Sequence, residues 1–209
     1  MYDLHHWPDS AALIVRLVLD ELGVPYRLHL INRDAGELDS PAYRAMNPLG
    51  QIPAFETPDG PMFETAAILL YLTERHPGMA PAPGSAARAA FLKWLFFTSS
   101  NIHPVMLQLY YPERTAGPDN SAAVAAHARA RLTELLQVLE TAKPEVVFAA
   151  QPNALGYYLA VLMRWIARDI PSQPFPNLHA LLIFLENRPA ALAAADAERL
   201  GTTIFSNPD

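Results

Sequence analysis

Residues 47–72 read NPLGQIPAFETPDGPMFETAAILLYL, and this stretch contains the pattern that decides the fold. After Pro53 it predicts two short strands joined by a turn at Pro58-Asp59-Gly60, because proline, aspartate and glycine favour tight turns. The apolar run that starts at Thr65 predicts a helix, with Thr65 as its N-cap and Pro77-Gly78 as its end. Two strands and a helix are therefore expected here.

The residues before this stretch predict a strand–helix–strand unit. Residues 1–7 alternate loosely between apolar and polar side chains, as in a short strand. Residues 9–24 predict a helix capped by Asp9 or Ser10, with Gly23 where the helix stops. Residues 25–31 alternate again and predict a second strand.

The chain after an Ala-, Pro- and Gly-rich stretch at residues 77–86 is predicted to be helical throughout. A long helix with a kink at Pro104 comes first, followed by an amphipathic helix. A third helix is apolar nearly all round and is expected to be the buried centre, and two shorter helices follow it. The predicted organisation is an α/β domain at residues 1–78, a linker at 79–86 and an all-α domain at 87–209.

The composition of the 209 residues excludes several classes of function. Hydrophobic residues make up 51%, which is typical of a globular chain. The net charge of −6 argues against nucleic acid as a partner, because phosphate binding needs a basic surface. No apolar run approaches the ~18 residues of a membrane span, so no membrane partner is expected. The first residues also lack the pattern of a signal peptide.

The absence of cysteine removes disulfides, thiolate metal sites and a cysteine nucleophile, and it fits a cytoplasmic protein. His5 and His6 are adjacent, so on a strand their side chains point to opposite faces and do not share a metal ion. The other histidines lack the spacing of metal ligands, and no metal is expected. A serine-hydrolase reading fails as well, because Ser10 lies in PDSAA and the chain has no G-x-S-x-G motif.

Two motifs carry a resemblance to a known family: NPLGQIP at residues 47–53 and ETAAI at residues 64–68, about eleven residues apart. With a strand–helix–strand unit before them and a helical domain after them, they resemble the cytosolic glutathione S-transferase superfamily over nearly the whole chain. The resemblance implies a thioredoxin-like N-terminal domain that binds glutathione. It also implies an all-α C-terminal domain that shapes a second-substrate pocket, and a homodimer.

The resemblance assigns glutathione binding to Gln51, Ile52, Pro53, Glu64 and Thr65. The family's proline at the position of Pro53 is cis, which leaves the backbone N–H and C=O of Ile52 for a tripeptide that docks like an added strand. Thr65, at a helix start, would bind the γ-glutamyl carboxylate, while Glu64 would pair with the ammonium group. Gln51 would support the peptide. The plainer alternatives are an ordinary proline turn and a helix cap followed by a first-turn acid.

Residues 94–113 resemble a cleft-lining stretch of the bacterial, beta-like branch of this family. His103 falls on the histidine of that stretch, whereas Pro104 replaces its lysine. His103 would orient or help to deprotonate a thiol, since its pKa lies near neutral; the alternative is a packing histidine beside a kink. Tyr110 and Tyr111 would line the substrate pocket, or else belong to the core.

Ser10 is the candidate hydroxyl partner of the thiolate, because it lies between the first strand and the first helix. A free thiol has a pKa of about 8.5, so a hydroxyl donor and a helix N-terminus would favour the anion. Counting back from Gly23 places the cysteine of the beta-like branch at Ala11, one position after Ser10, so a backbone donor is the alternative. Trp7 would lie in the same neighbourhood and line the pocket.

Together these features predict a glutathione transferase that conjugates glutathione, its co-substrate, to hydrophobic electrophiles in detoxification. A glutathione-dependent isomerase or lyase/dehalogenase on the same fold stays open. A non-catalytic glutathione-binding or scaffold protein is the third hypothesis. The complete set of glutathione-binding positions argues against a scaffold, while the displaced Ser10 keeps it open.

Overall fold

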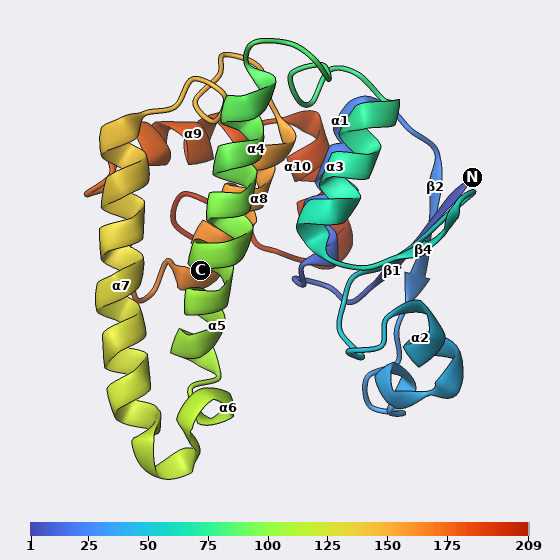
Figure 1. Cartoon of the computed structure of the whole chain (residues 1–209), viewed down its shortest axis with the longest axis horizontal. Helices are drawn as coiled ribbons and strands as arrows, with labels where there is room; N and C mark the ends of the chain where they lie inside the picture. The colour runs from blue at the N-terminus through green and yellow to red at the C-terminus, as the bar shows by residue number, and fades with distance from the viewer. Residues whose placement is uncertain (209) are drawn as a thin grey trace.

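The computed structural model describes residues 1–208 and consists of an α/β domain followed by a helical domain (Figure 1). This arrangement confirms the predicted fold class. The strands are β1 (Tyr2–His6), β2 (Tyr26–Leu30), β3 (Ala54–Thr57) and β4 (Gly60–Met62). The N-terminal helices are α1 (Ala12–Leu22), α2 (Pro41–Met46) and α3 (Thr65–Arg75), with a short 3-10 turn at Glu37–Asp39.

The four strands form one mixed sheet in the order β2-β1-β3-β4. β1 and β2 are parallel, with Leu4 opposite Leu28, and α1 makes the crossover that a parallel pair requires. β3 is antiparallel to β1, and β4 is antiparallel to β3. This is the thioredoxin-like arrangement expected for the first domain.

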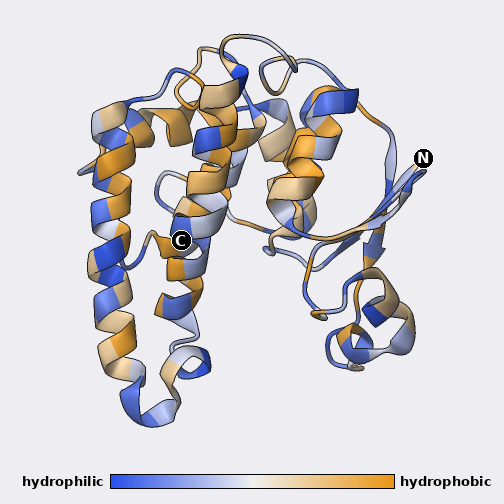
Figure 2. Ribbon diagram, in the orientation of Figure 1, coloured by the Kyte–Doolittle hydropathy of each residue, from blue (hydrophilic) through white to orange (hydrophobic). Residues whose placement is uncertain are grey.

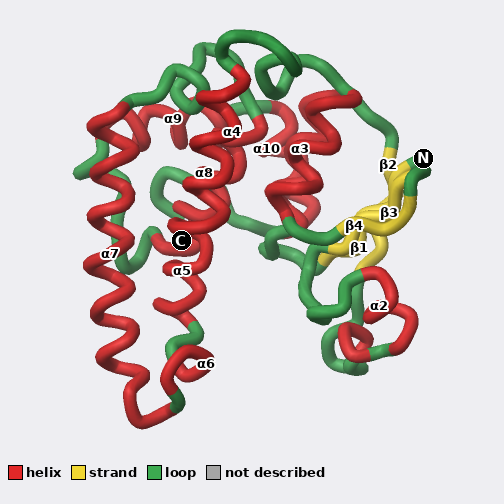
Figure 3. Tube along the Cα trace, viewed as in Figure 1, coloured by secondary structure: helices red, strands yellow, loops and turns green. Residues whose placement is uncertain are grey.

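The helix α3 lies between the sheet and the helical domain (Figure 3), and α1 packs against it (Figure 1). α1 contacts β1 and α3 on its own side and α8 and α10 on the other. Leu13 and Leu17 of α1 are fully buried, as expected for a helix covered on both sides. The two domains therefore share one continuous core, which fixes the position of the turn between β1 and α1.

The C-terminal domain is organised around α8, whose side chains are almost all buried. Figure 2 shows apolar residues on the helices that surround it and mostly hydrophilic residues at the turn between α6 and α7. No helix within residues 1–208 has the length and apolar character to cross a membrane. The helices are α4 (Arg88–Phe97), α5 (His103–Tyr110), α6 (Glu113–Ala116), α7 (Ser121–Ala142), α8 (Ala154–Ile166), α9 (Pro176–Glu186) and α10 (Pro189–Glu198), with a 3-10 turn at Pro118–Asn120.

The long helix expected around Pro104 is two helices, α4 and α5, joined by a π-helical turn at Thr98–Ile102. The N–H of His103 bonds to the carbonyl of Thr98, five residues earlier. Pro104 has no N–H to donate to the preceding turn, and such a loss is a common cause of an interrupted helix. The irregularity thus starts one turn before the proline and places His103 at the beginning of α5.

Two helix starts differ from the prediction. The cap position of α1 is Ala11, with no side-chain cap bond, rather than Asp9 or Ser10. The cap position of α3 is Glu64, so that Thr65 is the first helical residue rather than the cap. The side chains of Asp9 and Thr65 are left for other partners, whereas the Ser10 hydroxyl still accepts a hydrogen bond from the N–H of Ala12, the first residue of α1, at 3.3 Å.

The side chain of Asp9 binds the two domains together instead of capping α1. Its carboxylate accepts hydrogen bonds from Arg164 Nε at 3.0 Å, Arg164 Nη2 at 3.1 Å and Trp165 Nε1 at 2.9 Å. Further along, within α1, Arg16 pairs with Glu198 of α10 at 2.9 Å. These contacts hold the start of α1 against α8 and α10.

Candidate functional site

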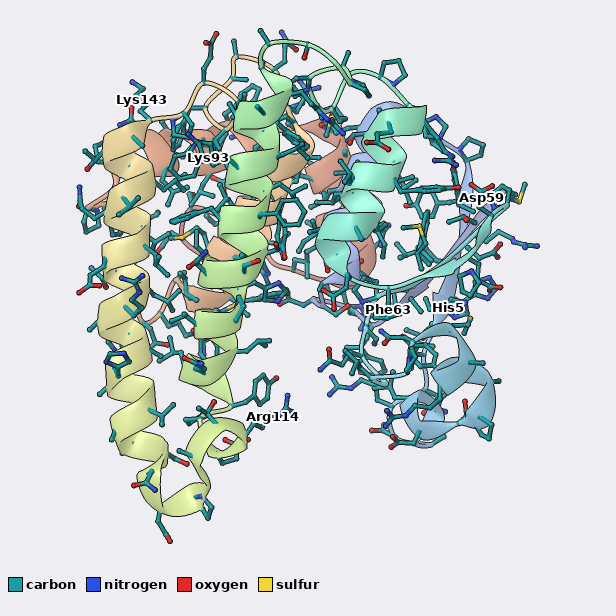
Figure 4. All side chains as sticks on the ribbon, viewed as in Figure 1. His5, Asp59, Phe63, Lys93, Arg114 and Lys143 are labelled. Atoms are coloured by element: carbon teal, nitrogen blue, oxygen red, sulfur yellow. The ribbon has the colours of Figure 1, made fainter. Side chains whose placement is uncertain are left out.

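A cavity of about 890 Å³ lies between the two domains. Figure 4 shows its two sides, with Phe63 on the N-terminal domain and Arg114 on the side of α6 that faces it. The structure brings all ten of the site residues expected from the sequence to this cavity. They are Trp7, Ser10, Gln51, Ile52, Pro53, Glu64 and Thr65 from the first domain and His103, Tyr110 and Tyr111 from the second.

The loop before β3 presents backbone groups to the cavity. The Ile52–Pro53 peptide bond is cis. The carbonyl of Gln51 accepts hydrogen bonds from Tyr43 Oη at 2.8 Å and Asn47 Nδ2 at 2.7 Å, which fix the loop. Within residues 1–208 the N–H and C=O of Ile52 have no hydrogen-bond partner. They form a short free edge on which an extended peptide can pair.

The N-terminus of α3 ends at the same cavity. Glu64 precedes the helix with a left-handed φ of 70° and is exposed. The hydroxyl of Thr65 has no partner in the described part of the chain and is not fully covered. The amides of the first helical turn lack intrahelical acceptors, and the helix dipole is positive at this end. The Thr65 hydroxyl and the first amides of α3 can together bind a carboxylate, and the adjacent Glu64 side chain can pair with a cation.

In the turn between β1 and α1, the group available to a ligand is a backbone N–H and not the Ser10 hydroxyl. The hydroxyl donates to the carbonyl of Trp7 at 2.6 Å and accepts from the N–H of Ala12 at 3.3 Å. Ala11 also lines the cavity, and its N–H has no hydrogen-bond partner within residues 1–208. An anion at this corner therefore meets a backbone N–H at the start of α1, where the dipole is favourable.

His103 lines the opposite side of the cavity and is paired with Tyr158 of α8. Its Nδ1 lies 2.9 Å from Tyr158 Oη. Burial lowers the pKa of His103 to about 4, so the ring is neutral near pH 7. Burial also raises the pKa of Tyr158, which keeps the phenol protonated.

The pair defines which nitrogen of His103 carries the proton. Tyr158 Oη has no second partner in the described chain, so its O–H is assigned as the donor to Nδ1, and Nε2 then carries the hydrogen. Nε2 has no partner within residues 1–208 and is not fully buried. His103 thus presents an N–H donor to the cavity rather than a base.

The tyrosines of the helical wall line the cavity and are not part of the core. Tyr110 is 38% exposed and Tyr111 is 42% exposed. The hydroxyl of Tyr110 has one hydrogen to donate and lies within hydrogen-bond distance of two acceptors, the carbonyl of Trp165 at 2.7 Å and the carboxylate of Asp169 at 3.0 Å. The guanidinium of Arg114 lies 4.0 Å from the centre of the Tyr111 ring.

Several cavity residues were missed by the sequence analysis. They include Tyr158 and Trp165 of α8 and the arginines Arg33, Arg114 and Arg168. No spacing links residues that come from different helices, so only the packing of those helices brings them together. The one available signal was the polar Arg164-Trp165 pair in an otherwise apolar helix.

The fold and cavity define a thioredoxin-like domain joined to a helical domain, with a cleft between them. Residues 4–80 match the family model described as glutathione S-transferase, N-terminal domain. The uncharacterized GST-like protein YncG of Escherichia coli (strain K12) is 30% identical over 170 residues, which cover 79% of this chain and 82% of that protein. The chain belongs to the glutathione S-transferase family.

Solved structures agree with this assignment. A glutathione transferase homologue from Sulfitobacter, solved with bound glutathione, superposes with a TM-score of 0.83 at 22% identity over 94% of this chain and 98% of that one, which shows the shared fold. A sphingomonad glutathione S-transferase in complex with glutathione gives a TM-score of 0.77 at 27% identity, covering 95% of this chain and 100% of that one.

Proposed function

We propose that this protein is a glutathione transferase that joins the thiol of glutathione to apolar electrophiles. The observation that carries the proposal is the convergence of three groups on one cavity. These are the free backbone edge at Ile52, the open start of α3 at Thr65 and the N–H donor of His103. The glutathione-bound relatives support the choice of ligand.

Glutathione would be held mainly by the N-terminal domain. Its main chain would pair with Ile52 as an added strand. Its γ-glutamyl carboxylate would accept hydrogen bonds from the Thr65 hydroxyl and the first amides of α3, and its ammonium group would face Glu64. Gln51 borders the same edge. This placement directs the cysteinyl side chain toward the start of α1.

The thiol would lose its proton to solvent, and the resulting thiolate would be stabilised by the Ala11 N–H and by the positive end of α1. The Nε2–H of His103 would donate from the helical side. The thiolate sulfur attacks the electrophilic carbon, a C–S bond forms, and the leaving group departs with its electron pair. In this scheme Ser10 shapes the turn and does not contact sulfur.

Family membership also supports two further parts of this proposal, a cytoplasmic location and a homodimer. Analytical sedimentation tests the homodimer, because it measures the mass of the protein in solution. A second candidate function is glutathione binding without turnover. The engaged hydroxyl of Ser10 favours it, because no free side-chain hydroxyl stands at the thiol corner.

A glutathione-affinity resin followed by a conjugation assay tests the proposal. We expect the protein to be retained, to elute with free glutathione, and to conjugate 1-chloro-2,4-dinitrobenzene or a related electrophile. Retention without turnover across an electrophile panel would establish the binding function instead. A protein that fails to bind glutathione by both resin and calorimetry would overturn both candidates.

A further inference from the structure

The helical wall of the cavity carries positive charge that the proposed glutathione contacts do not use. Arg114 of α6 and Arg168, which follows α8, both line the cavity and are exposed. Within residues 1–208, Arg168 has neither an ion pair nor a hydrogen bond through its side chain. The nearest carboxylate to Arg114 is that of its neighbour Glu113, at 4.0 Å.

The acidic groups on this side of the cavity are already neutralised. Asp9 is bound by Arg164 at 3.0 Å. Asp169 is bound by Arg129 of α7. Among the described residues that line the cavity, the remaining carboxylate is Glu64, at the α3 end of the N-terminal domain. Within residues 1–208, the helical side of the cavity thus has one arginine without a carboxylate partner, Arg168, and one, Arg114, whose only carboxylate partner is the exposed Glu113 at 4.0 Å. Arg33 of the N-terminal domain also lines the cavity, and the net charge of the chain is −6.

These cations border an aromatic surface. Tyr110 and Tyr111 are both partly exposed, and Arg114 lies against the Tyr111 ring. The hydroxyl of Tyr110 donates its hydrogen to the two acceptors described above, the Trp165 carbonyl and the Asp169 carboxylate, which holds its ring in place. A planar ligand can stack on such rings, while a guanidinium beside it binds a carboxylate through two parallel hydrogen bonds.

We propose that the second substrate is an aromatic electrophile that carries an anionic group, such as a carboxylate. Its ring lies against Tyr110 and Tyr111, and its anion binds Arg114 and Arg168. A neutral electrophile leaves Arg168 without a charged partner and Arg114 with only Glu113 and the Tyr111 ring. This inference rests on the proposed function, because it names the substrate class of the same cavity.

Binding of glutathione and of two aryl conjugates tests the inference by calorimetry. The conjugates are S-(4-carboxy-2-nitrophenyl)glutathione and its aryl methyl ester, which differ in one negative charge. We expect the carboxylate to bind about tenfold more tightly than the ester, with the ratio falling as salt is raised. Arg168→Gln and Arg114→Gln should each reduce this ratio about fivefold. Arg131→Gln, at an exposed arginine of α7 outside the cavity, is the matched control and should leave the ratio as in the wild type.

Binding of glutathione alone distinguishes a failure of the proposed function from a failure of the proposed substrate class. If glutathione binds and the two conjugates have equal Kd values, the anionic substrate class is wrong while the proposed function stands. A carboxylate preference that survives both arginine substitutions would overturn the assignment to Arg114 and Arg168. Failure of glutathione itself to bind would overturn the proposed function, and this inference with it.

Discussion

Ser10 lies where a catalytic hydroxyl was expected, but its side chain makes hydrogen bonds to the backbone of the turn. Its hydroxyl bonds to Trp7 and Ala12, which join the end of β1 to the start of α1. We expect Ser10→Ala to lower the free energy of unfolding by about 1–2 kcal/mol, because two hydrogen bonds of the turn are lost. The kcat/KM for conjugation should stay within about threefold of the wild type, because the Ser10 hydroxyl does not contact the sulfur. A threefold change corresponds to about 0.6 kcal/mol of activation free energy.

Urea unfolding and initial rates measure these two effects. Ser121→Ala is a matched control, because the Ser121 hydroxyl bonds to the Gly117 carbonyl at the start of α7, in the other domain. A loss of activity of about a hundredfold in Ser10→Ala, with stability unchanged, would show instead that the Ser10 hydroxyl reaches the sulfur.

Tyr158 is expected to set the proton position on His103. In Tyr158→Phe the imidazole loses its partner at Nδ1, so the proton is shared between both ring nitrogens and the donor facing the cavity is weakened. We expect kcat/KM to fall about tenfold, equivalent to about 1.4 kcal/mol. Nitrogen NMR of the histidine rings should show Nε2 protonated in the wild type and a mixture in the variant.

Tyr157→Phe provides the control for this experiment on the same helix. Tyr157 is also buried and also loses one hydroxyl hydrogen bond, in this case to Glu21 at 2.7 Å. Tyr157→Phe should lower the free energy of unfolding without changing the NMR signals of His103. Equal losses of activity in the two variants, or an unchanged His103 spectrum in Tyr158→Phe, would contradict the positioning role.

At the scale of elements, the start of α3 is expected to supply the carboxylate site. Thr65→Val removes the hydroxyl and keeps the shape of the side chain and the backbone amides. We expect the Kd for glutathione to rise about tenfold, because one charge-assisted hydrogen bond is lost while the helix dipole remains. Thr73→Val on the same helix is the control, since its hydroxyl bonds to the Leu69 carbonyl inside the helix. Similar Kd values for both variants by calorimetry would place the carboxylate elsewhere.

The elements themselves were largely predictable, because their signals are local. The turn at Pro58-Asp59-Gly60 and the stop at Gly23 follow from residues that favour those backbone angles. The starts of α1 and α3 were misplaced, since Asp9 and Thr65 are good caps by type. Each of these two side chains is instead directed to a partner or cavity that only the folded chain provides.

The site was predictable in the N-terminal domain and less so in the helical one. Ile52 and Thr65 lie in motifs that keep their spacing along the chain, so a sequence pattern marks them. Arg114 and Arg168 reach the cavity because α5 packs against α8 and α6 packs against α7, and that packing is not encoded in any short spacing. Likewise, the donor role of His103 depends on Tyr158, 55 residues further along the chain.

At the scale of the whole molecule, the two domains bury histidines that are expected to make the fold sensitive to acid. Burial lowers the pKa of His103 to about 4 and also lowers the pKa of His6 on β1. In the unfolded chain both groups take up protons near pH 6.5. The pKa values of Asp3 and Glu21 are lowered by hydrogen bonds to Arg27 and Arg188, and their contributions are lost only below about pH 4.5.

Stability should therefore fall as the pH drops from about 6.5 toward 4, because the unfolded state binds more protons than the folded state in this range. For His103 the loss amounts to about 2 kcal/mol by pH 5, at 1.36 kcal/mol per pH unit. Urea unfolding at about pH 7 and about pH 5, without glutathione, measures it. His103→Gln should remove most of this difference, whereas His127→Gln, at an exposed position on α7, should keep it. A pH dependence that is the same in wild type and His103→Gln would mean that folding does not lower the pKa of His103, which would contradict the burial of its ring described above.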